Sequence, residues 1–325
     1  MQKQKGGLLH RIRARRDRAL TGRRARIRLR RNRMSITLVA VVLALVLGHV
    51  APTLVAAWRH YHWYSAWLHW LGESAGDVWR GRYGIALALV PVLLLVALLQ
   101  WLLDGLVYGL VGLLFDIAIL VYAWGPRDLD LDVEAVIDAH DAPTRRAAIA
   151  RLGLTGEGAA LDGPALVEAV FANALQRWFG VLFWFLLLGP VGALLYRLAA
   201  QSAAATDLPE QNRTGARALK TALDWPVAQL MTLAMALVGN FDTVFSAWRE
   251  AGGTRFRLDT GFLAHVARAS VRVELAEEAE EYAEEGMVQT MRDLPELRDA
   301  MSLVWRILLL WMAVLALFVI GGWVS

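Results

Sequence analysis

The chain has 325 residues, of which 57% are hydrophobic and 14 are tryptophan, and its mean hydropathy is +0.41. This composition exceeds that of soluble domains and is typical of an integral membrane protein. The absence of cysteine excludes disulfides, thiolate metal sites and cysteine nucleophiles. The formal net charge of +4 is unevenly spread, because 14 of the 34 Lys and Arg residues precede Met34 and only Asp17 opposes them. The remainder carries 20 basic and 29 acidic residues.

Residues 1–33 form a basic arm with no aromatic residue and no apolar run long enough for a signal peptide. Such an arm could bind anionic lipid headgroups, at about 1 kcal/mol per basic residue near the surface, or nucleic acid without specificity. Met34, however, opens a well-formed membrane segment. We therefore favour an upstream extension of the reading frame and expect no specific nucleic-acid partner.

Residues 34–124 are predicted to form three transmembrane helices, over 34–57 and then as a pair within 84–124. Asp104 is expected in the turn of that pair. Asp116 lies deeper in its second helix and is a functional candidate, since an acid inside a span costs about 2.5–3.5 kcal/mol on insertion scales. The aromatic cluster between the first two spans contains His60 and His62. Without a companion ligand they indicate interfacial packing and no metal site.

Residues 125–177 are polar and spaced for amphipathic helices, so we predict a cytoplasmic helical segment. Residues 200–302 are assigned to cytoplasmic or interfacial helices, one of which is expected to begin at Pro226 with Asp224 or its neighbour as its cap. Within this region ELAEEAEEYAEE is expected to be a solvated helix face, with divalent-cation binding as the alternative. Residues 303–324 form the final transmembrane helix.

The stretch from residue 168 to 197 contains an apolar run that is broken at Gly189-Pro190 and has Arg177 and Arg197 at its shoulders. The break leaves arms of about eleven and seven residues, whereas a spanning helix needs about 20. Proline lacks an N–H group and disfavours helix at the residue before it. We predict a re-entrant hairpin over residues 178–199, with a single kinked spanning helix as the alternative. The fold class is thus all-α and polytopic, with about four transmembrane helices plus this hairpin.

Charge near the last span predicts the orientation. Arg292, Arg298 and Arg306 precede or open that span and no basic residue follows it, so the carboxyl terminus is expected outside the cytoplasm. Four spans then place the amino terminus outside the cytoplasm as well. The basic arm disagrees with this, because positively charged segments are expected on the cytoplasmic side, whereas a start at Met34 removes the conflict. Both polar segments become cytoplasmic, and a bacterial inner membrane is the expected location.

Four phrases carry a resemblance to a known family: MSITLVAVVLALVLGHVAP, RDLDLDVEAVIDA, FANALQRWFGVLFWFLLLGPVGALLYR and LDWPVAQLMTLAMALVGNF. From residue 34 onward the chain resembles AmpE, an inner-membrane protein linked to β-lactamase induction. AmpE is similar in turn to the CobD and CbiB synthases, which use ATP to join an aminopropanol-type amine to a corrinoid carboxylate. Their pattern of ESxAEN, DG, an apolar run, a Gly-Pro-Gly-Ala break, YK and NTLDSM is matched here at Glu168, Asn173, Phe183, Gly192, Ala193 and Tyr196, and Arg197 stands for the lysine.

The departures from the synthase pattern concern its acidic residues. Ala172 stands for the second Glu of ESxAEN, Gln176 for the Asp of DG, and residues 200–205 read AQSAAA where the family has NTLDSM. No segment like HSPNAG follows Trp248. Polyphosphate chemistry needs carboxylates to hold magnesium. The resemblance therefore implies a synthase scaffold whose catalytic set is lost or rebuilt.

The leading hypothesis is a non-catalytic, AmpE-like modulator that senses a nucleotide or envelope metabolite and requires no cofactor. Its cytoplasmic cleft would be lined by Glu168, Asn173, Arg177, Tyr196, Arg197 and Asp224. A structural alternative leaves both arginines and Tyr196 as interfacial anchors, with Glu168 and Asn173 capping or pairing locally. The functional alternative is an ATP- and magnesium-dependent amide-forming synthase, with ligands from Asp104, Asp116 or the glutamate run. A transporter is disfavoured because no second broken segment matches the first. A homo-oligomer is compatible with each hypothesis.

Overall fold

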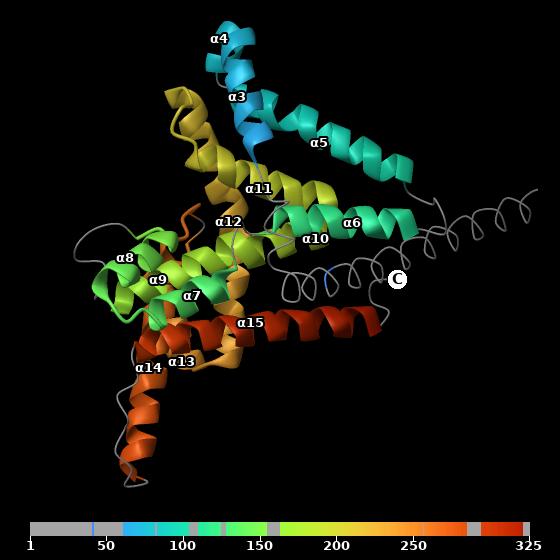
Figure 1. The fold of residues 1–325 in the computed structure, drawn as a ribbon. Coiled ribbons are helices and arrows are strands. Elements are labelled where there is room, and N and C mark those ends of the chain that lie inside the picture. The colour runs from blue at the N-terminus through green and yellow to red at the C-terminus, as the bar shows by residue number, and fades with distance from the viewer. Residues whose placement is uncertain are drawn as a thin grey trace, which may run out of the picture.

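The computed structural model describes Val41 and residues 61–81, 83–103, 110–124, 128–154, 163–255, 257–284 and 294–320. The basic arm, most of the first predicted span, His60 and Asp104 lie outside these residues. Every regular element in the described ranges is a helix (Figure 1). These elements are α3 (His62–Ser74), α4 (Gly76–Arg80), α5 (Gly84–Leu103), α6 (Leu110–Ala123), α7 (Leu129–Ile137), α8 (Ala142–Arg151), α9 (Gly163–Ala174), the π-helix η3 (Leu175–Phe179), α10 (Gly180–Leu188), α11 (Pro190–Ala204), α12 (Glu210–Val238), α13 (Phe241–Glu250), α14 (Gly261–Glu284) and α15 (Pro295–Ile320).

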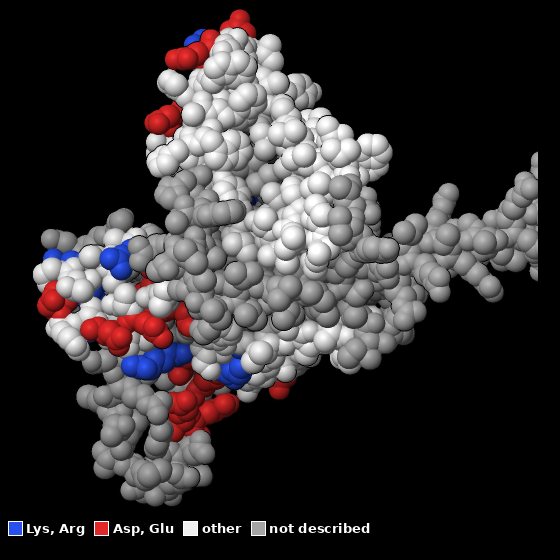
Figure 2. Space-filling model, turned by 45° about the vertical axis from the view of Figure 1, so that its right-hand side comes forward, with Lys and Arg blue, Asp and Glu red and all other residues white. Residues whose placement is uncertain are grey.

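Four of the described helices are long and apolar enough to cross a membrane: Gly84–Leu103, Gly163–Leu188, Glu210–Val238 and Pro295–Phe318. The predicted class is confirmed, and the protein is an all-α polytopic membrane protein that contacts the lipid bilayer. Leu98 and Trp101 on α5 and Leu317 on α15 are exposed, as lipid-facing side chains should be. Figure 2 shows charged side chains gathered at the top and at the lower left of the visible face, and the described side chains between them are mostly uncharged.

The break at Gly189-Pro190 is a reversal of the chain. Gly189 has a φ of +69°, which favours glycine, and Pro190 opens α11. A Cβ on Gly180 would lie 2.1 Å from Cζ of Tyr196, and one on Gly192 would lie 2.1 Å from the carbonyl oxygen of Trp184. These two contacts place α10 and α11 side by side and antiparallel, which excludes the single kinked helix.

The first arm of this hairpin is longer than its sequence indicates. The helices α9, η3 and α10 follow one another without a gap over Gly163–Leu188, a span of 26 residues. The second arm, α11, has 15 residues. The re-entrant path of the hairpin through the membrane stays a prediction.

The predicted helix start at Pro226 is wrong, and so is the capping role of Asp224. Helix α12 begins at Glu210 and runs for 29 residues, with Pro226 in its interior and Asp224 buried in the turn before it. Proline removes one backbone hydrogen bond from a helix. The carbonyl group that loses its donor is that of Ala222, four residues before Pro226. At the next carbonyl oxygen, that of Leu223, the indole of Trp184 donates a hydrogen bond of 3.1 Å.

Helix α11 lies at the centre of the bundle and contacts α5, α6, α10 and α12. On one side of it, a small core gathers Tyr64, Leu68 and Trp79 around Leu198. The larger core lies among α9, α10, α12, α14 and α15, with Phe171 and Phe185 fully buried. Helix α14 extends away from the bundle (Figure 1). A residue on α11 is therefore enclosed by helices on several sides, which allows polar groups to be held there away from lipid.

The two predicted amphipathic helices after residue 125 are present as α7 and α8. Asp128 caps α7 by accepting from the Asp130 amide, and Asp141 caps α8 by accepting from the Thr144 amide at 2.7 Å. Hydrogen bonds from Thr144 hold the pKa of Asp141 below its ordinary value. Both helices lie beside α9 at one end of the molecule (Figure 1).

Candidate functional site

A hydrogen-bonded network is buried where α11 and α12 meet the π-helix. The Tyr196 hydroxyl donates to Oδ1 of Asp224 at 2.6 Å, and Nζ of Lys220 lies 2.5 Å from Oδ2 of the same carboxylate. The Leu175 carbonyl oxygen is 3.3 Å from the Tyr196 hydroxyl. Tyr196 is 1% exposed and Asp224 is 3% exposed. Both carboxylate oxygens of Asp224 are thus occupied by side chains of the protein.

The hairpin geometry holds Tyr196 in this position. Its ring packs directly against Gly180, where any side chain would collide with it. The widened turn of η3 ends at the residue before Gly180, and π-helical turns are frequent at functional sites. The close approach of the two hairpin arms, through glycine, therefore brings the hydroxyl of Tyr196 to α12.

Arg177 takes part in a separate, buried ion pair. Its Nη1 donates to Oδ2 of Asp132 at 2.7 Å, and its Nη2 donates to the Arg151 carbonyl oxygen at 3.0 Å. Asp132 is fully buried and Arg177 is 8% exposed. This pair ties η3 to α7 and α8, which come from the predicted cytoplasmic segment. The Arg177 guanidinium is thus held inside the protein, and its role as an anchor of the hairpin at the interface stays a prediction.

Asn173 and Arg197 bind backbone carbonyl groups. Nδ2 of Asn173 donates to the carbonyl oxygens of Leu152 and Ala169 at 2.9 and 2.8 Å. Arg197 is 4% exposed, and its Nε donates at 2.7 Å to the carbonyl oxygen of Ala123, the last residue of α6. A cation at a helix C-terminus is stabilised by the helix dipole. Arg197 is therefore held by a helix end inside the protein, and its role as an interfacial anchor stays a prediction.

Glu168 lies apart from these groups and near solvent. Its Oε1 is 3.0 Å from Nε of Arg268 on α14, and both side chains are about 40% exposed, at 40% and 43%. The preceding residue, Val167, lines a cavity between α9, α14 and α15. Through Val167 and its partner Arg268, Glu168 thus adjoins a cavity large enough for a ligand.

The structure brings together Tyr196 and Asp224 and distributes the other four residues over separate contacts. Two further residues take part in these contacts and were not among the predicted site residues: Asp132, which pairs with Arg177, and Lys220, which pairs with Asp224. The spacing of Lys220 and Asp224, four residues apart on a helix, could have indicated their contact. No such signal exists for Asp132, because it is 45 residues from Arg177. The function of the predicted residues stays a prediction.

Replacing Tyr196 by phenylalanine is expected to lower the free energy of unfolding by about 1.5–3 kcal/mol, because a buried carboxylate loses its donor. The matched control is Tyr64→Phe. Tyr64 shares a 2.7 Å hydrogen bond with Ser202, and burial raises its pKa to about 12, so its hydroxyl stays neutral. The control should lose only about 0.5–1.5 kcal/mol. Unfolding in mixed detergent micelles measures the stability of both variants. Equal losses of stability would contradict the interpretation that Tyr196 donates to a charged acceptor, the carboxylate of Asp224.

The fold and its buried polar groups define a multi-pass helical membrane protein built around a central helical hairpin. In sequence it is 29% identical over 198 residues to the cobalamin biosynthesis protein CobD of Chromobacterium violaceum, an alignment that covers 58% of this chain and 63% of that protein. It is 31% identical over 189 residues to CobD of Stutzerimonas stutzeri, covering 54% of this chain and 60% of the relative. The chain therefore spans less than two thirds of each of these relatives. No model of a known protein family and no solved structure matches the chain.

These similarities support the predicted relation to the CobD and CbiB proteins. They favour the CobD-type alternative over the regulatory hypothesis, because both relatives are named cobalamin biosynthesis proteins. The resemblance to AmpE stays a prediction.

Proposed function

We propose that this protein is a membrane enzyme of the CobD type, which uses ATP to join a carboxylate substrate to an amine as an amide. The observation that carries the proposal is about 30% identity to two cobalamin biosynthesis proteins over more than half of the chain. A bacterial inner membrane is its proposed location. Its carboxylate substrate is a corrinoid or another acid.

The geometry supports part of this proposal. Glu168 and Tyr196, which match the synthase pattern, are contributed by two helices of one hairpin assembly, and Glu168 adjoins a cavity. The magnesium requirement fits less well. Among the described residues no three His, Asp or Glu side chains are grouped closely enough to hold a metal ion. We therefore assign no step to magnesium and no ligand role to Asp116, which lies half-buried in α6.

The test is turnover by the full chain in detergent or nanodiscs, with ATP, magnesium, a corrinoid acid and aminopropanol as probes. Amide product and ATP consumption that depend on all components are expected. Glu168→Gln should reduce turnover, while Glu210→Gln, which changes a similarly ion-paired but 74% exposed glutamate, should not. A protein that neither binds nucleotide nor forms amide would refute the enzymatic proposal.

A second candidate is a non-catalytic modulator of the AmpE kind. The observation that favours it is the closed state of the polar network: Lys220 and Tyr196 occupy both oxygens of Asp224. Alanines at residues 172, 200, 203 and 204 stand where the synthases carry polar or acidic residues. Its test is to measure β-lactamase induction in the native bacterium after deletion of the gene. A change in induction that a plasmid copy of the gene reverses, together with no amide formation by the purified protein, would select this candidate over the enzyme.

A further inference from the structure

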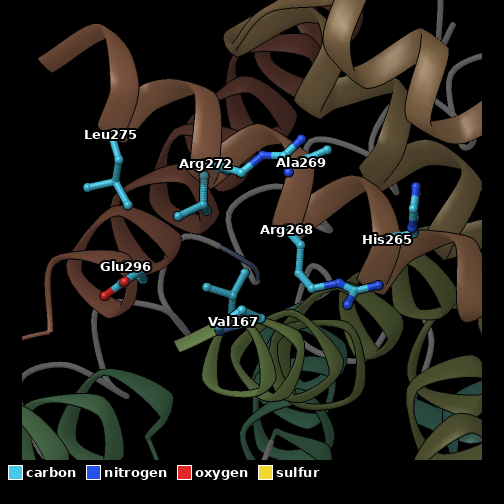
Figure 3. Close-up of a pocket in the computed structure, with 9 residues that line it drawn as sticks. Val167, His265, Arg268, Ala269, Arg272, Leu275 and Glu296 are labelled. Carbon is cyan, nitrogen blue, oxygen red and sulfur yellow. The ribbon is translucent and has the colours of Figure 1, made fainter. Parts of the chain in front are cut away.

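A cavity of about 480 Å³ opens between α9, α14 and α15, apart from the polar network around Asp224. Figure 3 shows its residues along α14, from Leu275 to His265, with Val167 of α9 opposite them. The apolar part of its wall includes Val167, Ala269 and Leu275. Ligand cavities in proteins commonly measure about 300–1,000 Å³. This cavity is therefore large enough for a small organic molecule.

Three basic side chains follow one face of α14 at this cavity. His265, Arg268 and Arg272 are separated by three and then four residues, which is the spacing of neighbours on a helix. In Figure 3 the side chains of Arg268 and Arg272 extend toward the same side, away from Glu296. The cavity thus has a basic side next to an apolar wall.

The charges at the cavity are only partly compensated. Arg268 is paired with Glu168, whereas Arg272 is exposed and makes no hydrogen bond or ion pair with the described residues. The carboxylate of Glu296 lies at the first residue of α9, where a Cβ on Gly163 would be 3.1 Å from it. The dipole of α9 favours negative charge there. Within the described part of the chain, the charge left without a partner at the cavity is therefore the positive charge of Arg272.

We propose that this cavity binds an organic anion, with a phosphate or carboxylate group at Arg272 and an apolar body of a few carbon atoms against Val167 and Leu275. A guanidinium group binds such anions through two parallel hydrogen bonds. Two sources carry this chemistry, a water-soluble metabolite and the headgroup of an anionic lipid. The inference rests on the cavity and its charges, and it holds whether or not the chain forms amides.

The test is calorimetric binding of phenyl phosphate to the full chain in nanodiscs of phosphatidylcholine. Inorganic phosphate serves as the probe with charge alone. Phenyl phosphate should bind at least about tenfold more tightly, because its ring buries apolar surface in the cavity. Equal affinities for the two probes would overturn the proposal, since the apolar wall would then contribute nothing.

Variants separate the two parts of the site. Arg272→Gln should weaken phenyl phosphate binding about tenfold, the loss expected for a charge-assisted hydrogen bond. Arg249→Gln on α13 removes an exposed arginine that does not line the cavity, and it should leave the affinity unchanged. Ala269→Leu reduces the apolar space and should weaken phenyl phosphate binding more than phosphate binding. Equal losses of affinity for phenyl phosphate in Arg272→Gln and Arg249→Gln would refute the proposed site.

The source of the anion follows from the same assay with phosphatidic acid added to the nanodiscs. Weaker apparent binding of phenyl phosphate to the wild-type chain, with no such change for Arg272→Gln, would identify a lipid headgroup as the competing ligand. Unchanged binding would support a soluble anion.

Discussion

Replacing Arg177 by methionine is expected to lower the free energy of unfolding by about 3–5 kcal/mol, because it leaves the carboxylate of Asp132 buried without its cation. Asp132 is fully buried, so water cannot take over the role of the guanidinium. Unfolding in mixed detergent micelles measures the loss. Arg249→Met, at an exposed position on α13, is the matched control and should change the free energy by less than about 0.5 kcal/mol.

The double variant Arg177→Met with Asp132→Leu tests the cause. When both charges are removed, most of the lost stability should return, since an apolar pair of similar volume avoids the cost of burying ions. A double variant as unstable as the single one would mean that Arg177 acts mainly through its bond to the Arg151 carbonyl oxygen, and the ion-pair interpretation would be wrong.

Gly192→Ala is the second change with a large expected effect, a loss of about 3 kcal/mol, at the upper end of the cost of overpacking. The new Cβ would lie 2.1 Å from the carbonyl oxygen of Trp184, and this neighbour is backbone, which cannot rotate away. The two arms of the hairpin would have to separate. The measurement is again unfolding in mixed micelles, together with protease sensitivity of the hairpin.

Gly215→Ala is the control for that change. Gly215 also lies inside a helix, but its nearest neighbour to a new Cβ would be Cγ1 of Ile85 at an ordinary 3.8 Å. Alanine has a higher helix propensity than glycine, so this variant should be stabilised by up to about 1 kcal/mol. Two glycine-to-alanine substitutions are thus expected to change the free energy of unfolding in opposite directions. The same sign in both would contradict the close packing of α10 and α11.

Sequence chemistry predicts those parts of the fold that depend on local properties. Hydropathy indicated the membrane class, and Gly189-Pro190 indicated the chain reversal because its backbone restrictions apply in any environment. The start of α12 could not be predicted in this way. Its first half is polar, and a proline suits both a helix's first turn and an interior break that neighbours compensate. The helical residues before Pro226, which begin at Glu210, distinguish the two.

The candidate site was harder to predict because it depends on packing between distant segments. The sequence indicated Tyr196 and Asp224 separately, yet their contact requires the reversal at Gly189 and the absence of a side chain at Gly180. The pairing of Arg177 with Asp132 joins η3 to a helix 45 residues earlier in the chain. The unpaired charge of Arg272 could not be recognised from sequence, because several acidic residues follow it closely and could have neutralised it.

The π-helix Leu175–Phe179 holds one more residue than the α-helical turn that could replace it. Deleting one residue there would restore a regular α-helix without rotating the residues beyond it, because both kinds of turn complete one turn about the axis. Gly180 would then still face Tyr196. A deletion in an α-helical part of the same arm would instead rotate the residues beyond it by about 100° relative to those before it. Single-residue deletions in homologues of this arm should therefore fall within residues 175–179.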